Sequence, residues 1–147
     1  MIKSNKMEVL APVGSFESLT AAIKAGCDSI YFGVEQLNMR SRSSVNFTTD
    51  DLEEISKTCQ ANHIKAYLTM NTVLYDHDIQ LMKTLINKAK ESGISAVIAA
   101  DHAVMSYCKS VGMPLHISTQ ANVTNIETVE FYAAFANVVV LSREMSL

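Results

Sequence analysis

The sequence contains no apolar run near the roughly 20 residues that a membrane-spanning helix requires. Its first residues include no hydrophobic leader and pass directly into a strand-like segment, which argues against a signal peptide. We therefore expect a cytoplasmic protein without a membrane anchor. Cysteine is also sparse, since Cys27, Cys59 and Cys108 lie far apart and match no disulfide framework or metal-ligand spacing. We expect buried, reduced thiols, no metal site and no cofactor in this chain.

Basic residues are outnumbered by acidic ones. The 147 residues carry 12 Lys and Arg against 15 Asp and Glu, a net charge of −3. Domains that bind nucleic acid on their own usually carry a basic patch or stripe. We therefore expect contact with nucleic acid only through a longer parent protein. With 48% hydrophobic residues, the chain is long enough to bury a core as a single domain over residues 1–147.

Strand-like and helix-like patterns of apolar residues alternate from end to end. They predict strands over residues 7–11, 29–32, 64–70, 96–100, 115–117 and 138–141, and helices over residues 16–25, 49–62, 76–92, 102–110 and 126–135. The continuous apolar run at 96–100 indicates a strand that is buried on both faces. Ser15 is predicted to cap the first helix without a full capping box, because Ser18 rather than Glu or Gln occupies the third helical position. The short turns between units indicate parallel strands joined by helical crossovers.

Two architectures fit this alternation: an open doubly wound sheet and a TIM-type barrel. Residues 11–15, Ala-Pro-Val-Gly-Ser, lack the G-x-G-x-x-G spacing of a dinucleotide site, so the dinucleotide-binding version of the open sheet loses support. Polar residues after nearly every strand are typical of the C-terminal edge of a barrel. A full barrel has eight units in about 250 residues, so we predict an α/β fold that is a partial TIM-type (β/α) barrel of about six units. Its open strand edges need further chain or a partner, and we expect a homodimer that covers them.

The segment His116–Asn125 concentrates hydrogen-bonding groups. Seven of its ten side chains are polar, and none of the ten is Gly, Pro, Asp, Glu, Lys or Arg. Surface turns normally use Gly, Pro or Asp, so we interpret the segment as a strand exit that recognises a polar group. The alternative is that Thr124 or Asn125 caps the following helix and that the rest is an ordinary loop.

Six motifs, in order along the chain, resemble those of one protein family. They are Leu-Ala-Pro-Val-Gly at 10–14, Ala-Gly-Cys-Asp-Ser-Ile-Tyr-Phe-Gly at 25–33, Asn-Met-Arg at 38–40 with Asn-Phe at 46–47, Leu-Thr-Met-Asn-Thr at 68–72, the ten residues at 116–125, and Val-Leu-Ser-Arg-Glu at 140–144. From Glu8 to Leu147 the chain resembles the N-terminal region of the collagenase-like U32 peptidase family.

The resemblance implies a peptidase, some of whose relatives are linked to collagen degradation. Other members act in the hydroxylation of tRNA, ribosomal RNA or the ubiquinone ring, some of them through an iron–sulfur cluster. The cluster ligands of those members lie downstream of the region matched here. An iron–sulfur cluster is therefore implied only for a longer member of the family.

The polar residues at the predicted strand exits form our candidate site. His116 and Ser118 lie on the same face of a strand, so we hypothesise that they act as catalytic base and nucleophile with Glu144 as the carboxylate. The residues predicted to bind a peptide or another polar substrate are Tyr31, Arg40, Asn46, Asn71, Asp101, Gln120, Asn122 and Arg143. Among them, the two arginines suit a carboxylate or phosphate, which the guanidinium group binds in a bidentate manner.

Each candidate also has a structural alternative. Ion pairs of Arg143 with Glu144, or of Arg40 with Asp101, explain the charged residues equally well. A hydrogen-bonded core histidine explains His116 as well as a general base does. No G-x-S-x-G elbow surrounds a candidate serine, and a metal site would lack ligands at recognisable spacing. The other three histidines lie at predicted helix ends or in loops, where we expect them to be solvated.

Three functional hypotheses therefore stand. The chain is part of a peptidase, active or inactive on its own; or it is the N-terminal half of an RNA- or quinone-hydroxylation protein; or it is a non-catalytic association module. Hydrolysis of denatured collagen or casein would favour the first hypothesis, and an iron–sulfur chromophore in a full-length form would favour the second.

Overall fold

The computed structural model describes residues 6–34, 37 and 47–146. Its centre is one six-stranded sheet in which all neighbouring strands are parallel and the strand order follows the sequence. The strands are β1 (Leu10–Pro12), β2 (Ser29–Phe32), β3 (Lys65–Met70), β4 (Ala96–Ala99), β5 (Leu115–Ile117) and β6 (Val138–Val139). This order is that of consecutive β/α units in a barrel.

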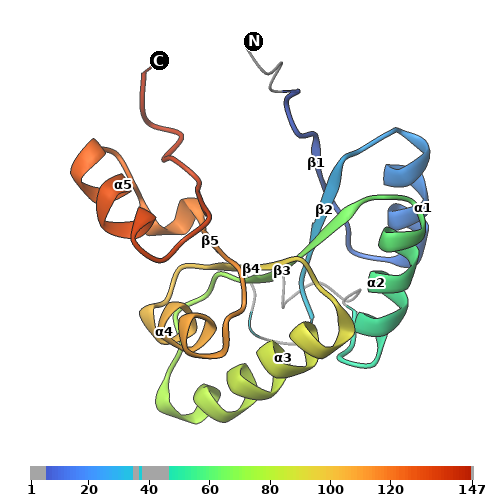
Figure 1. Cartoon of the computed structure of the whole chain (residues 1–147), viewed down its shortest axis with the longest axis horizontal. Coiled ribbons are helices and arrows are strands. Elements are labelled where there is room, and N and C mark those ends of the chain that lie inside the picture. Colours follow the sequence, from blue (N-terminus) through green and yellow to red (C-terminus); the bar gives the residue numbers. More distant parts are fainter. Residues whose placement is uncertain (1–5, 35–36, 38–46, 147) are drawn as a thin grey trace.

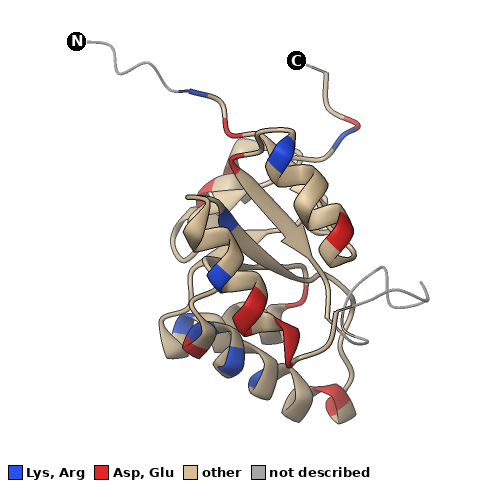
Figure 2. Ribbon diagram, turned by 90° about the vertical axis from the view of Figure 1, so that its right-hand side faces the viewer, with Lys and Arg blue, Asp and Glu red and all other residues tan. Residues whose placement is uncertain are grey.

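The helices cover the outer, convex face of the curved sheet (Figure 1). In the described part of the chain they are α1 (Phe16–Lys24), α2 (Asp51–Ala61), α3 (Ile79–Ser92), α4 (His102–Val111) and α5 (Ile126–Ala133), with short 3₁₀ helices η1 (Asp76–Asp78) and η2 (Thr119–Ala121). The predicted partial TIM-type barrel of about six units is confirmed. Of the helices described, none has both the length and the apolar character needed to cross a bilayer. Charged residues lie mainly on the helices, with both signs interspersed, and the strands carry few (Figure 2).

The two faces of the sheet differ in burial. Side chains on the convex face, such as Ile30, Leu68 and Ile117, are fully buried beneath the helices. Alternate side chains face the concave side, where Ile98 and His116 are only half-buried. The prediction that the strand at 96–100 is buried on both faces is therefore wrong for Ile98, because the half-barrel leaves its inner face open.

Two strands differ from their predicted bounds by more than one residue. β1 starts at Leu10 and includes Pro12. A proline is tolerated there because β1 is an edge strand, so the missing N–H of Pro12 removes no hydrogen bond between strands. β6 ends at Val139, after which Leu141 pairs with Val123 in an isolated bridge. The chain continues along the exit of β5, since the Val140 N–H donates to the Ile117 carbonyl at 3.0 Å, and it brings Val140 and Arg143 to the concave side of the sheet.

The start of α1 also corrects the sequence analysis. Ser15 Oγ accepts a hydrogen bond from the Ser18 N–H at 3.1 Å, and Ser18 Oγ accepts one from the Ser15 N–H at 2.9 Å. The capping box is therefore complete. A serine hydroxyl reaches back to the capping residue as Glu or Gln would, so the absence of those two residues was no reason to exclude the box.

Candidate functional site

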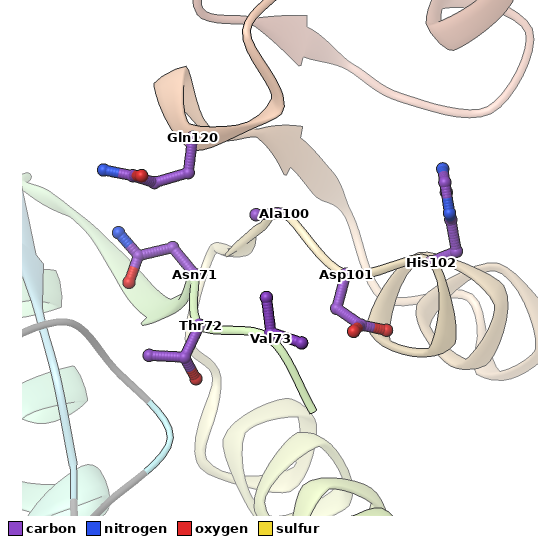
Figure 3. A pocket seen from close by; sticks show the side chains of 7 residues that line it. All are labelled: Asn71, Thr72, Val73, Ala100, Asp101, His102 and Gln120. Atoms are coloured by element: carbon purple, nitrogen blue, oxygen red, sulfur yellow. The ribbon is translucent and has the colours of Figure 1, made fainter. Parts of the chain in front are cut away.

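The exits of β3, β4 and β5 surround a hollow at the C-terminal edge of the sheet. This rim hollow has a volume of about 330 Å³ and is lined by Asn71, Thr72, Val73, Ala100, Asp101, His102 and Gln120 (Figure 3). Because parallel strands end at the same edge, residues far apart in the sequence meet there. Three of the predicted substrate-binding residues, Asn71, Asp101 and Gln120, are brought together.

A second hollow opens on the concave face of the sheet. This concave hollow has a volume of about 500 Å³ and is lined by Leu10, Tyr31, Thr69, Asn71, Ile98, Ser118, Thr119, Gln120, Val140 and Arg143. It adds the predicted residues Tyr31, Ser118 and Arg143 to the site. Asn71 and Gln120 line both hollows and therefore stand between them.

Ser118 is held in a structural contact. Its side chain is only 3% exposed, and its Oγ accepts a hydrogen bond from the Gln120 N–H at 3.2 Å, which caps η2. Asn122 follows with a left-handed backbone (φ 52°) and an exposed side chain that lines neither hollow. Asn125 caps α5, since its Oδ1 accepts from the Thr128 N–H at 2.9 Å. The polar segment thus combines one capping role that was predicted with a turn that presents Gln120.

Asp101 is fully engaged by the backbone. Its Oδ1 accepts a hydrogen bond from the Ala103 N–H at 2.8 Å and caps α4, while its Oδ2 accepts one from the Leu74 N–H at 3.1 Å. Figure 3 shows this carboxylate on the side of the hollow formed by the chain segment that carries Val73. The carboxylate therefore connects the strand exits of β3 and β4.

His116 lies deeper on the concave face. It lines a hollow of about 240 Å³ with Glu8, Leu10, Tyr67, Ile98, Val138 and Val140. Its ring packs edge-on against Tyr67, with 4.6 Å between the ring centroids, and the Tyr67 hydroxyl donates a hydrogen bond of 2.6 Å to Glu8. Burial lowers the pKa of His116, although the Glu8 carboxylate acts in the opposite direction. The imidazole is therefore a neutral group near neutral pH.

The hydrogen bond between Tyr67 and Glu8 shifts the pKa of both residues. The hydroxyl groups of Ser29 and Tyr67, together with Lys65, lower the pKa of Glu8. Burial and the Glu8 carboxylate raise the pKa of Tyr67. Over the physiological range the carboxylate is charged and the phenol is protonated, which is the arrangement that their hydrogen bond requires.

The three residues of the hypothesised triad occupy separate environments. Across the described ranges, no hydrogen bond joins His116 to Ser118 or to Glu144. Glu144 instead accepts a hydrogen bond from the Ser142 hydroxyl, which lowers the pKa of the carboxyl group. The catalytic role of the three residues stays a prediction.

The remaining candidates divide between described and undescribed parts of the chain. Arg143 lines the concave hollow, and among the described residues it forms no ion pair with Glu144. Arg40 and Asn46 lie outside the described residues, and so does the alternative pair of Arg40 with Asp101.

The described residues show no cluster typical of a metal centre. Over residues 6–34, 37 and 47–146, no three His, Cys, Asp or Glu side chains are grouped to hold an ion. All three cysteines are buried, and burial raises the pKa of Cys59 to about 11 and of Cys108 to about 12. Such thiols remain protonated and are poor nucleophiles.

Thr69 and His102 are among the lining residues that sequence reasoning did not select. Thr69 is 9% exposed and lines the concave hollow, and its hydroxyl has no hydrogen-bond partner in the described part of the chain. His102 lines the rim hollow, although its position at a helix end suggested only a solvated residue. The period-two alternation from Tyr67 through Thr69 to Asn71 was the signal that could have placed Thr69 on the inner face.

Comparisons with known proteins place these features in a family. A model described as "Peptidase family U32" matches residues 14–147. A collagenase from Porphyromonas gingivalis is 54% identical over 143 residues, which cover 97% of this chain and 34% of that protein. A tRNA hydroxylation protein P from Helicobacter pylori is 32% identical over 146 residues, which cover 97% of this chain and 35% of that protein. The chain spans about a third of the length of these curated relatives.

The fold has a counterpart among solved structures. A structure described as a U32 peptidase matches 96% of this chain and 61% of its own chain, with a TM-score of 0.72 and 17% sequence identity. At this identity the match concerns the fold, and it agrees with the half-barrel seen here.

Proposed function

Because this chain belongs to peptidase family U32, we propose that it supplies the N-terminal half of a substrate-binding barrel in a collagenase-type peptidase. The observation that carries this proposal is the position of Asn71 and Gln120, which line both the rim hollow and the concave hollow. A primary amide both donates and accepts hydrogen bonds, as a peptide group does. The substrate would be a polypeptide with an exposed backbone, such as denatured collagen.

The concave hollow would receive a side chain of the same substrate. Leu10, Ile98 and Val140 give it apolar walls, and the Thr69 hydroxyl provides a hydrogen-bond donor that lacks an acceptor among the described residues. Satisfying a buried hydroxyl on binding contributes to affinity, because leaving it unpaired costs free energy in the empty protein. Arg143 adds a cation for an acidic group of the substrate.

Hydrolysis would need more than the described residues. His116 packs against Tyr67, Ser118 caps η2 and Glu144 accepts from Ser142, so these three do not form the linked series that activates a serine. We propose that this chain binds the substrate and that a longer protein of the collagenase type completes the reaction. The similarity to the Porphyromonas gingivalis collagenase supports this assignment.

A second candidate is the N-terminal half of an RNA- or quinone-hydroxylation protein, and the similarity to the Helicobacter pylori tRNA hydroxylation protein supports its RNA branch. Binding of RNA depends on cations that neutralise phosphates. The chain has 12 Lys and Arg against 15 Asp and Glu, and the described helices carry both signs interspersed (Figure 2). This charge distribution favours a peptide ligand over RNA, which is a polyanion.

The test compares two labelled ligands, gelatin peptides and tRNA, by fluorescence anisotropy with the purified chain. We expect gelatin peptides to bind and Asn71→Ala or Gln120→Ala to weaken binding about tenfold, the effect of losing one or two hydrogen bonds. Gln80→Ala, an exposed glutamine on α3, is the matched control and should leave binding unchanged. Binding of tRNA that the same two variants weaken would favour the second candidate, and a chain that binds neither ligand would overturn the proposal.

A further inference from the structure

Asp101 joins two adjoining backbone segments that both line the rim hollow. Its two carboxylate oxygens accept hydrogen bonds from the Ala103 N–H of α4 at 2.8 Å and from the Leu74 N–H at 3.1 Å. Asp101 and Leu74 are 27 residues apart in the sequence. Each oxygen therefore already accepts one backbone hydrogen bond, which fixes the orientation of the carboxylate.

The segment tied by Asp101 is the loop between β3 and η1, residues 71–75. It contains no helix or strand, and it carries Asn71, Thr72 and Val73 of the rim hollow. Val73 is 73% exposed, so packing holds its side chain weakly. The next amide along the loop, that of Tyr75, donates to Asp78 Oδ2 at 2.9 Å. Two carboxylates thus hold two successive amides of a loop that has little packing at its tip.

We propose that Asp101 is a positioning residue, which holds the loop 71–75 against the start of α4 and so sets the width of the rim hollow. This inference rests on the proposed binding function of that hollow. Charge-assisted hydrogen bonds that a carboxylate accepts are stronger than neutral ones, so one residue can fix both segments. Asp101 then acts on the substrate through Asn71, whose backbone it places opposite Gln120 on η2.

The plain alternative is that Asp101 only caps α4. Asn125 offers a matched comparison, because it caps α5 through the Thr128 N–H and lines neither hollow. The variant Asp101→Ser separates the two roles. Serine is a favoured capping residue, but its single short hydroxyl cannot serve the Ala103 and Leu74 amides together.

The experiment measures amide hydrogen exchange, side-chain amide NMR signals and gelatin-peptide affinity for Asp101→Ser, Asp101→Ala and Asn125→Ser. In Asp101→Ser we expect exchange at Leu74 to accelerate about tenfold and exchange at Ala103 to change less than about threefold. In Asp101→Ala both amides should exchange faster. The side-chain signals of Asn71 should shift in both Asp101 variants and stay in place in Asn125→Ser.

Gelatin-peptide affinity distinguishes a positioning role of Asp101 from a role in stability alone. We expect Asp101→Ser to weaken gelatin-peptide binding about fivefold, and Asn125→Ser to leave it unchanged. Unchanged exchange at Leu74, unmoved Asn71 signals or unchanged affinity in Asp101→Ser would overturn the inference. If the wild-type chain binds no gelatin, the proposed function fails, while the exchange and Asn71 signals still decide whether Asp101 shapes the hollow.

Discussion

Tyr67 on β3 and His116 on β5 pack edge to face across the concave side of the sheet, with 4.6 Å between their ring centroids. The Tyr67 hydroxyl points to the N-terminal side of the sheet, where it donates to Glu8 at 2.6 Å. One aromatic ring thus links the segment before β1 to two interior strands. This contact restrains the concave face of the sheet beneath the candidate site.

Tyr67→Phe should destabilise the chain by about 1.5 kcal/mol, the lower end for a hydrogen bond to a charged group, since Glu8 is partly exposed. Chemical denaturation measures this change. Tyr107→Phe is the matched control, because it removes an exposed hydrogen bond to Asn87 of 2.9 Å and should cost no more than about 0.5 kcal/mol. Equal losses in the two variants would contradict the structural role of the Glu8 contact.

Stability should fall in acid because of His116. Its folded-state pKa is lowered, mainly by burial, below the unfolded value of about 6.5. The unfolded chain therefore binds the proton more readily, so the contribution is fully present above about pH 6.5 and is lost as the pH falls below that value. His116→Gln should flatten the stability–pH curve between pH 7 and pH 5, as measured by urea denaturation. An unchanged slope in this variant would assign the acid sensitivity to other groups.

Thr69→Val should have opposite effects on stability and on binding. Valine has the shape of threonine without the hydroxyl that lacks a partner, so the variant should be more stable by about 1 kcal/mol. Gelatin-peptide affinity should fall, because the hollow loses a donor. Thr84→Val on the exposed face of α3 is the control for a threonine-to-valine change. A variant that is less stable than wild type would show that the hydroxyl already has a structural partner.

The purified chain should associate through the open edges of the half-barrel. Val138 and Val140, at and just after edge strand β6, are 44% and 41% exposed, and unpaired strand edges favour association. We expect light scattering to show dimers that dissociate in Val138→Lys or Val140→Lys. Val73→Lys places the same charge on an exposed valine away from the edge and should leave dimers intact. A monomer at high concentration would contradict the expectation.

Local patterns predicted much of the fold. The run Ser29–Phe32 was placed without error, and the six strands in their order followed from alternating apolar periods and short turns. The capping box at Ser15 and Ser18 was missed, although it too is local, because the prediction allowed only Glu or Gln at the third position. For the site, Asn71, Asp101 and Gln120 were selected from the sequence as strand-exit residues and lie in one hollow, while their role in binding stays a prediction.

The sequence by itself determined the order of the elements, the caps and the choice of polar residues at the strand exits, because these depend on neighbours within a few positions. Only the tertiary structure decided which contacts those residues make. It placed both oxygens of Asp101 against backbone amides and His116 below the rim beside Tyr67, and it left the Thr69 hydroxyl buried, without a partner among the described residues, in the wall of a hollow. These contacts join residues that are tens of positions apart, such as Glu8 and Tyr67, which are separated by 59. They exist because the curvature of the sheet brings those residues together, and no local period encodes that curvature.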